Sequence, residues 1–251
     1  MASFLLVHGS WHGAWCWEKL VPFLDGAGHV VLAVDLPGHG DDKTPAAEVT
    51  LASYGRAVCR GARSLPPPVV AVGHSMGGWA ISQAAESCPD RFAALIYLCA
   101  FLPRDGLSVS EIAGDRVRAT LDGALETDEA NACTRIRNGM AREIFYGDCS
   151  QEDAVRAEAR LGPDPVAPIT APIRLSDERY GRIPRAYIEC TRDRILPLES
   201  QRAMVASAGC RETATLTTGH SPFLAAPAEL AERLTDLASR LLAGAATGRG
   251  A

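Results

Sequence analysis

The feature that most constrains the fold of this chain is the stretch of residues 66–78, PPPVVAVGHSMGG. Its VVAV run is short, apolar and β-branched, with prolines before it and glycines after it, which predicts a buried parallel strand. The residues that follow, WAISQAAESC, are compatible with a helix. Between the two, Gly73, Ser75 and Gly77 form a G-x-S-x-G pattern, so the sequence predicts a sharp strand-turn-helix junction with a serine at its apex.

Ser75 is the candidate nucleophile. A turn of this kind holds the serine in a strained conformation that presents its hydroxyl above the sheet, so positions 73 and 77 must lack side chains. The helix that starts here also directs unpaired backbone N–H groups towards the place where an oxyanion would form. The alternative is a glycine-rich turn around an ordinary serine, and the flanking strand and helix favour the nucleophile.

Five further segments with a strand pattern, the first three of them apolar runs, predict a sheet around this junction. They cover residues 2–7, 29–34, 92–100, 185–190 and 211–216. Helix-compatible segments alternate with them, which is typical of a parallel sheet with right-handed crossovers. The predicted fold class is α/β, with a mostly parallel sheet of about six strands flanked by helices.

The alternation stops at residues 104–184. This segment is charged, lacks a clear strand pattern, and contains three stretches that could each be a helix, at residues 109–117, 128–140 and 150–160. An insertion that leaves the sheet at the end carrying the serine would lie over it, so we expect a helical cap rather than a loosely packed excursion. The predicted organisation is an α/β core of residues 1–103 and 185–251, with the cap of residues 104–184 inserted before the predicted strand at residues 185–190.

Composition and charge narrow the function classes. At 251 residues the chain can bury a sizeable core, and its net charge of −5 gives no electrostatic basis for binding nucleic acid or an anionic membrane surface. No apolar run approaches the roughly 18 residues of a membrane helix, and the N-terminus lacks the features of a secretion signal. We therefore expect a cytoplasmic protein that acts on a small molecule.

The eight cysteines raise the question of disulfides or zinc. They stand at positions 16, 59, 88, 99, 133, 149, 190 and 210, and no two have C-x-x-C spacing. Several fall inside apolar runs, and none has a neighbourhood that nominates it as a nucleophile. We expect reduced, mostly buried thiols, with no metal and no cofactor.

His220 is the candidate base. A serine hydroxyl is a weak nucleophile at neutral pH, so it needs a base within reach and an acid that fixes the base. Of the six histidines, His220 stands on a loop after the last predicted strand, at the edge where open α/β sheets place their sites. The alternative is an exposed loop histidine.

Asp193 is the candidate acid. In this architecture the acid follows a strand and lies between the serine and the histidine in the chain, as Asp193 does. Asp164 and Asp177 are rivals, but neither follows a predicted strand. A surface ion pair of Asp193 with Arg192 or Arg194 is the alternative.

Two backbone N–H groups are expected to bind the oxyanion. One belongs to Met76, directly after the serine, and we assign the other to Ser10, in the loop after the first strand. Apolar residues near the mouth of the site are expected to bind substrate, although each suits a core position equally well. They are Trp11, Trp79, Phe101, Leu102 and Phe223.

Several motifs together resemble the α/β-hydrolase superfamily. They are HGSWHGAWCW near the N-terminus, DLPGHG after the second strand, GHSMGG, TRDRILP and GHSPFLAAP. Within the superfamily they are similar to the branch of plant methylesterases, hydroxynitrile lyases and small bacterial esterases, over nearly the whole chain except the cap. The resemblance implies Ser75, Asp193 and His220 as the triad, with Ser10 and Met76 as the oxyanion hole.

Two positions favour ester hydrolysis over cyanohydrin cleavage. The lyases of that branch carry a threonine where this chain has Gly9, and a lysine after the catalytic histidine, where this chain has Ser221. We therefore expect a serine hydrolase that cleaves the carboxylic ester of a small molecule, aromatic or of secondary-metabolite type, through an acyl-enzyme. A homodimer is compatible with the sequence. The alternatives are a lyase or polyketide-type cyclase that uses the triad as acid and base, and a non-catalytic receptor for a small ligand.

Overall fold

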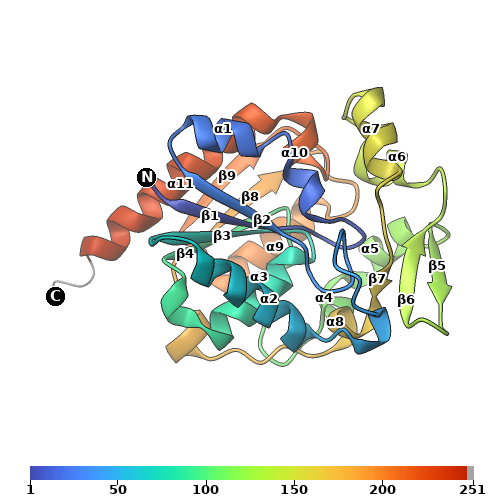
Figure 1. The fold of residues 1–251 in the computed structure, drawn as a ribbon, viewed down its shortest axis with the longest axis horizontal. Coiled ribbons are helices and arrows are strands. Elements are labelled where there is room, and N and C mark those ends of the chain that lie inside the picture. Colours follow the sequence, from blue (N-terminus) through green and yellow to red (C-terminus); the bar gives the residue numbers. More distant parts are fainter. Residues whose placement is uncertain (248–251) are drawn as a thin grey trace.

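One parallel sheet forms the centre of the computed structural model, which describes residues 1–247 (Figure 1). Its six strands lie in the order β2-β1-β3-β4-β8-β9, and every neighbouring pair is parallel. The bounds are β1 Ser3–Val7, β2 Val30–Val34, β3 Val69–His74, β4 Ala94–Leu98, β8 Arg185–Cys190 and β9 Glu212–Leu216. All six strands expected from the sequence are present, and the predicted α/β class is confirmed.

Helices cover both faces of the sheet, which is why its central strands are almost entirely apolar. β1, β3 and β4 are buried at every position, the pattern of parallel strands covered on both sides. Figure 1 shows α1, α10 and α11 on one face and α2, α3 and α9 on the other. Their bounds are α1 Val21–Gly26, α2 Leu51–Ser64, α3 Gly77–Ser87, α9 Leu198–Ala208, α10 Pro222–Ala225 and α11 Pro227–Thr247.

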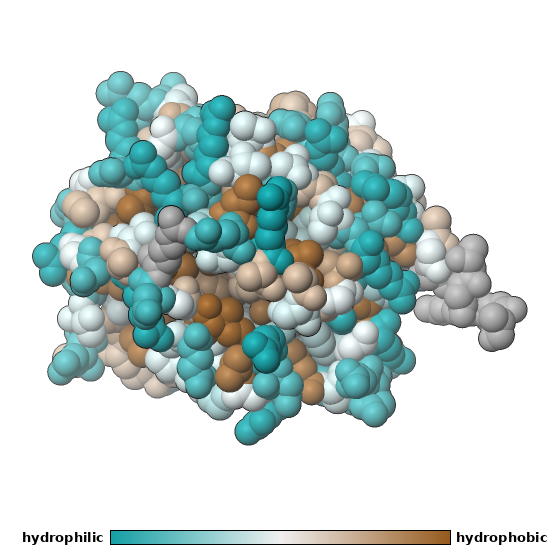
Figure 2. Space-filling view, turned by 180° about the vertical axis from the view of Figure 1, so that it is seen from behind, coloured by the Kyte–Doolittle hydropathy of each residue, from teal (hydrophilic) through white to brown (hydrophobic). Residues whose placement is uncertain are grey.

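The outer surface is mostly hydrophilic. On the face opposite to that of Figure 1, apolar residues gather near the middle and hydrophilic residues surround them (Figure 2). Within residues 1–247, none of the helices combines the length and the apolar character needed to cross a lipid bilayer.

Residues 104–184, here called the inserted segment, leave the sheet after β4 and return to it at β8. The segment forms a layer at one end of the sheet (Figure 1). It contains α4 Val109–Ile112, α5 Gly114–Leu121, β5 Leu125–Asp128, β6 Cys133–Ile136, α6 Ala141–Phe145, α7 Gln151–Glu158, β7 Asp164–Pro165, α8 Val166–Thr170 and a π-helical turn at Asp177–Gly181. The first and third of its predicted helices are therefore present, the first in two short pieces.

The prediction of an entirely helical insertion is wrong, because residues 128–140 form part of a small antiparallel sheet. The order of this three-stranded sheet is β5-β6-β7. Turn chemistry explains the difference. The Asp128 carboxylate accepts hydrogen bonds from the backbone N–H of Asn131 at 3.1 Å and from its side chain at 2.7 Å, and Ala132 has a φ of 52°. Asp and Asn favour such turns and end a helix.

The prediction of eight reduced thiols is also wrong, because Cys59 and Cys88 form a disulfide. Cys59 lies on α2 and Cys88 directly follows α3, and these helices pack against each other on one face of the sheet. Packing thus joins two cysteines that are 29 residues apart in the sequence. The other six cysteines are free thiols.

Candidate active site

Ser75 stands at the turn between β3 and α3, and its φ of 53° places it in the left-handed region. A Cβ atom at Gly77 would lie 2.5 Å from the carbonyl oxygen of His8, and one at Gly73 would lie 2.6 Å from the carbonyl oxygen of Gly77. Side chains at these positions would therefore collide with backbone. The structure thus explains why glycines flank the serine, as expected for a strained junction that presents a hydroxyl.

His220 and Asp193 form a buried pair at the same end of the sheet. Nδ1 of His220, on the loop after β9, donates to Oδ2 of Asp193, on the loop after β8, at 2.7 Å. The other carboxylate oxygen accepts from the backbone N–H groups of Ile195 and Leu196, at 2.8 and 2.9 Å. These three bonds fix the carboxylate, which in turn fixes the orientation of the imidazole and leaves Nε2 as its second, proton-accepting nitrogen.

Ser75 and His220 line one cavity of about 160 Å³. Among the hydrogen bonds of residues 1–247, none joins the Ser75 hydroxyl to the His220 imidazole. Catalytic hydrogen bonds are often long in unliganded sites and tighten with substrate, so the shared cavity is the observation that groups these side chains.

The inserted segment supplies about half of the cavity lining. Its contributors are mostly apolar and come from α4, α5, α6, α8 and the single residue between α4 and α5. They are Val109, Ser110, Ala113, Val117, Arg118, Leu121, Phe145 and Ile169. Sequence reasoning missed all of them, although a signal was present: an apolar residue recurs every fourth position from Val109 to Leu121, the spacing of one helix face.

The five expected substrate-binding residues separate into two groups. Trp11 and Phe101 line the cavity. The other three do not belong to the lining and are buried in the core instead. They are Trp79, Leu102 and Phe223, each at most 1% exposed. The structure therefore places these three side chains away from the cavity wall, because apolar residues next to a motif can equally face the helices that pack on the sheet.

The two expected oxyanion donors are unpaired. Within the described part of the chain, no hydrogen bond uses the backbone N–H of Ser10 or of Met76. Ser10 lines the cavity, and the neighbouring loop lies against the serine, since a Cβ atom at Gly9 would be 2.8 Å from Cβ of Ser75. Free N–H groups beside a serine hydroxyl are what an oxyanion hole requires.

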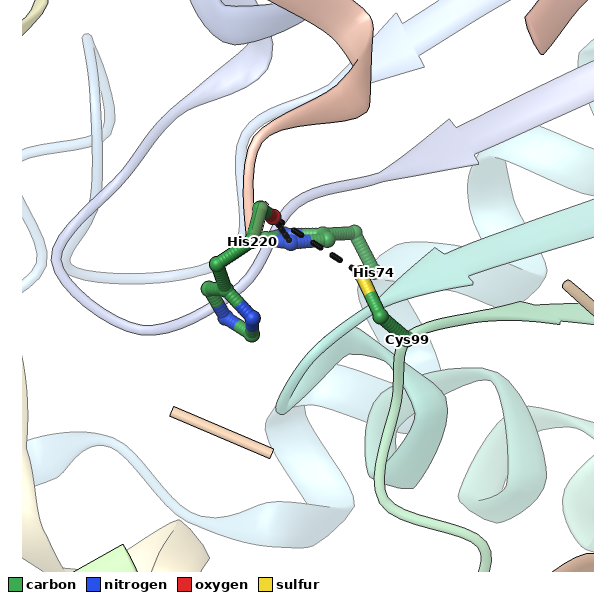
Figure 3. Close-up of side chains that lie close together, drawn as sticks. All are labelled: His74, Cys99 and His220. Carbon is green, nitrogen blue, oxygen red and sulfur yellow. Dashed lines mark hydrogen bonds between the residues drawn. The ribbon is translucent and has the colours of Figure 1, made fainter. Parts of the chain in front are cut away.

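His74, Cys99 and His220 place potential metal-binding atoms within 4.8 Å of one another. Figure 3 shows that the first two side chains point at the carbonyl oxygen of His220. Nε2 of His74 donates to that oxygen at 2.7 Å and the Cys99 thiol donates at 3.6 Å. The atoms that face the carbonyl thus carry protons, and the cluster is a support for the His220 backbone rather than a set of free ligands.

Burial keeps the neighbouring titratable groups neutral. It lowers the pKa of His12 to about 4, and it lowers the pKa of His74 well below 6.5, with a further contribution from His220. Burial also raises the pKa of the Cys99 thiol well above its usual value, which disfavours the thiolate. His12 and His74 therefore contribute little positive charge to the cavity wall around Ser75.

The rival acids lie elsewhere. Oδ1 of Asp164 accepts from Nε2 of His39 at 2.9 Å, and Asp177 is exposed on the inserted segment. Neither bonds to His220, whose Nδ1 is already bonded to Asp193.

Known protein families, sequences and structures are similar to this chain over most of its length. A family model described as the alpha/beta hydrolase family matches residues 4–233. Polyneuridine aldehyde esterase of Rauvolfia serpentina is 32% identical, with 93% of this chain and 94% of the relative covered. Salicylic acid-binding protein 2 of Nicotiana tabacum is 31% identical, with 94% and 97% covered. The crystal structure of a pyrethroid hydrolase from Sphingobium faniae superposes with a TM-score of 0.86 at 29% identity, covering 95% of this chain and 97% of that one.

Proposed function

Because the chain belongs to the α/β hydrolase family, we propose that it is a serine carboxylesterase that cleaves small-molecule esters through an acyl-enzyme at Ser75. The observation that carries the proposal is the buried pair of His220 and Asp193, whose imidazole lines the same cavity as the Ser75 hydroxyl. The esterase and hydrolase names of the similar proteins support the same reaction class.

The first half of the proposed reaction forms the acyl-enzyme. The Ser75 oxygen attacks the ester carbonyl carbon while Nε2 of His220 takes the hydroxyl proton. Asp193 stabilises the imidazolium that results, and the N–H groups of Ser10 and Met76 bind the oxyanion. The tetrahedral intermediate then collapses, and His220 returns its proton to the departing alcohol oxygen.

The second half releases the acid. Water takes the place of the alcohol. His220 accepts a proton from this water, and the resulting hydroxide adds to the acyl carbon. The second tetrahedral intermediate expels the Ser75 oxygen, which takes its proton back from the imidazole. No charge has to be created in the apolar part of the cavity, because the oxyanion and the imidazolium form next to their partners.

The cavity supports a compact substrate. A cavity of about 150 Å³ lined by apolar side chains accommodates benzene, so the roughly 160 Å³ here suit one aromatic ring or a short acyl chain. Trp11, Phe101 and the apolar residues of the inserted segment would surround that group and act as the cap over it. A small ester, aromatic on one side, fits this lining better than a long lipid.

Hydrolysis is favoured over cyanohydrin cleavage by the residues beside the triad. Ser221, directly after His220, is fully buried and carries no charge that could hold a departing cyanide. At position 9, a side chain would crowd Ser75 and the ring of His74, which a Cβ atom would approach to 3.0 Å.

Turnover of p-nitrophenyl acetate tests the proposal. Ser75→Ala should lower kcat by orders of magnitude with the fold intact, and His220→Ala should do the same. Ser64→Ala, a serine-to-alanine change at the end of α2, is the matched control and should retain wild-type kcat. Near-normal turnover in Ser75→Ala would remove this serine from the mechanism, and covalent labelling by a phosphonate without turnover would favour the non-hydrolytic alternative.

The cytoplasmic location and the homodimer remain proposals from the sequence. The Cys59–Cys88 bond disfavours a cytoplasmic location, because disulfides persist mainly in oxidising compartments. Cell fractionation and sedimentation would decide the two questions separately.

A further inference from the structure

The loop of residues 9–13, here called the oxyanion loop, is held from the inserted segment. Trp11 has a φ of 61°, in the left-handed region that a bulky side chain rarely adopts. Its carbonyl oxygen accepts from the N–H of Gly162 at 2.8 Å, and its indole Nε1 donates to Oγ1 of Thr134 at 3.2 Å. Contacts from outside the loop therefore stabilise a conformation that the loop would not choose alone.

The peptide between Ser10 and Trp11 is anchored at both of its polar ends. The N–H of Trp11 donates to Oδ1 of Asp164 at 3.3 Å. The carbonyl oxygen of Ser10 accepts from Nδ1 of His12 at 2.8 Å, and Nε2 of the same ring accepts from the Tyr146 hydroxyl at 2.8 Å. Asp164 and Tyr146 both belong to the inserted segment. This peptide cannot rotate unless one of these bonds breaks, and the free N–H of Ser10 is one residue away.

The environment of Asp164 is unfavourable for a carboxylate that has only a structural role. It is fully buried, Oδ1 also accepts from Nε2 of His39, and Oδ2 has no partner among the described residues. A buried carboxylate with an unsatisfied oxygen destabilises a fold relative to an apolar side chain of the same size. Its hydrogen bond to Trp11 gives it a role that an apolar residue could not perform.

We propose that Asp164 and Tyr146 are positioning residues for the oxyanion hole, because they fix the Ser10–Trp11 peptide and so aim the Ser10 N–H at the oxyanion. The inference rests on the proposed function. It assigns to the inserted segment a part in the chemistry as well as in substrate contact: one of the two oxyanion donors is correctly oriented only when the segment is docked on the core.

Three substitutions distinguish a positioning role of Asp164 from a contribution to stability alone. Asp164→Ala removes the acceptor and should lower kcat for p-nitrophenyl acetate at least tenfold at nearly unchanged KM, since loss of an oxyanion donor costs about 100- to 1000-fold. Asp164→Asn should retain most of the activity, because a single oxygen accepts from both Trp11 and His39. Asp153→Ala is the matched control. Asp153 also joins the inserted segment to the core, through Lys19 at 2.5 Å, without contacting the loop, so kcat should not change.

A pair of ketones gives a readout that a merely structural role would not move. With trifluoroacetophenone, the Ser75 oxygen bonds to the ketone carbon, the carbonyl π electrons move to the oxygen, and the hydroxyl proton passes to His220. The product is an oxyanion in the hole. Acetophenone binds the same cavity without this step. In Asp164→Ala, the affinity for the trifluoro compound should fall by the same factor as kcat, and the affinity for acetophenone should not change.

The outcomes are distinct. Wild-type kcat in Asp164→Ala, or an equal loss of affinity for both ketones, would overturn the inference. If Asp164→Ala does not fold, Tyr146→Phe decides: a several-fold loss of kcat with a parallel loss for trifluoroacetophenone supports the inference, and unchanged values overturn it. Wild-type protein that shows no Ser75-dependent turnover would refute the proposed function and this inference with it, and is recognised before any variant at position 164 is measured.

Discussion

Acidification below pH 6.5 should destabilise this protein strongly, because the fold holds three buried histidines in the neutral form. Nε2 of His8 accepts from the N–H of Leu36 at 3.0 Å and Nδ1 of His12 donates to a carbonyl oxygen, as Nε2 of His74 does. Burial is the largest cause that lowers each pKa, to about 4 for His12 and well below 6.5 for His8 and His74.

The direction and the magnitude of this loss of stability follow from the linkage between proton binding and folding. Unfolded histidines take up protons near pH 6.5, whereas these three stay neutral in the fold, so the unfolded state binds more protons and stability falls as pH falls. For His12, the full shift from 6.5 to about 4 corresponds to about 3.4 kcal/mol, of which about 2 kcal/mol is lost by pH 5. Burial also lowers the pKa values of His8 and His74, so both add to this loss in the same direction and the total exceeds the contribution of His12.

Urea unfolding at pH 7.5 and pH 5.0 measures this loss. A loss of more than about 2 kcal/mol is a large part of the stability of many domains, which is about 5 to 15 kcal/mol. His12→Gln should reduce the loss by about 2 kcal/mol, whereas His29→Gln, at a partly buried imidazole, should reduce it less. A total loss below about 2 kcal/mol, or a loss that His12→Gln does not change, would refute the reasoning.

Three further predictions test the backbone, the disulfide and the acid. Gly77→Ala places a Cβ atom 2.5 Å from a carbonyl oxygen and should lower both Tm and kcat, whereas Gly26→Ala, with nothing within 4 Å, should change the unfolding free energy by less than about 1 kcal/mol. Replacing Cys59 and Cys88 together by serine should lower the unfolding free energy by about 3 to 4 kcal/mol on the loop-entropy model, and thiol titration of unfolded wild type without reductant should find six thiols. Asp193→Asn should lower kcat by about 10³ to 10⁴ without unfolding the protein, as far-ultraviolet circular dichroism would show.

The sequence was sufficient for the core and insufficient for the inserted segment. The central strands β1, β3 and β4 are buried at every position and so give a clear apolar signal, and the alternation of strand and helix patterns located the remaining strands. Residues 128–140 have helix-compatible composition, but the hydrogen bonds between Asp128 and Asn131 end any helix there. The disulfide depends on how α2 and α3 pack, which no spacing in the sequence records.

In the candidate site, too, some residues could be predicted from the sequence and others could not. Ser75, Asp193 and His220 could be selected because strained-turn sterics and the order of the strands restrict each choice to few residues. The cavity walls could not be selected so well, because an apolar side chain such as Trp79 or Phe223 suits a helix interface as well as a pocket. Only the docked inserted segment decides which of them faces the serine.

The acyl-enzyme at Ser75 is the most direct test of the account. Wild-type protein mixed with p-nitrophenyl acetate and quenched in acid should gain the mass of one acetyl group, located on the peptide that contains Ser75 and absent from Ser75→Ala. Turnover without this modification, or an acetyl group on a different residue during turnover, would contradict the account.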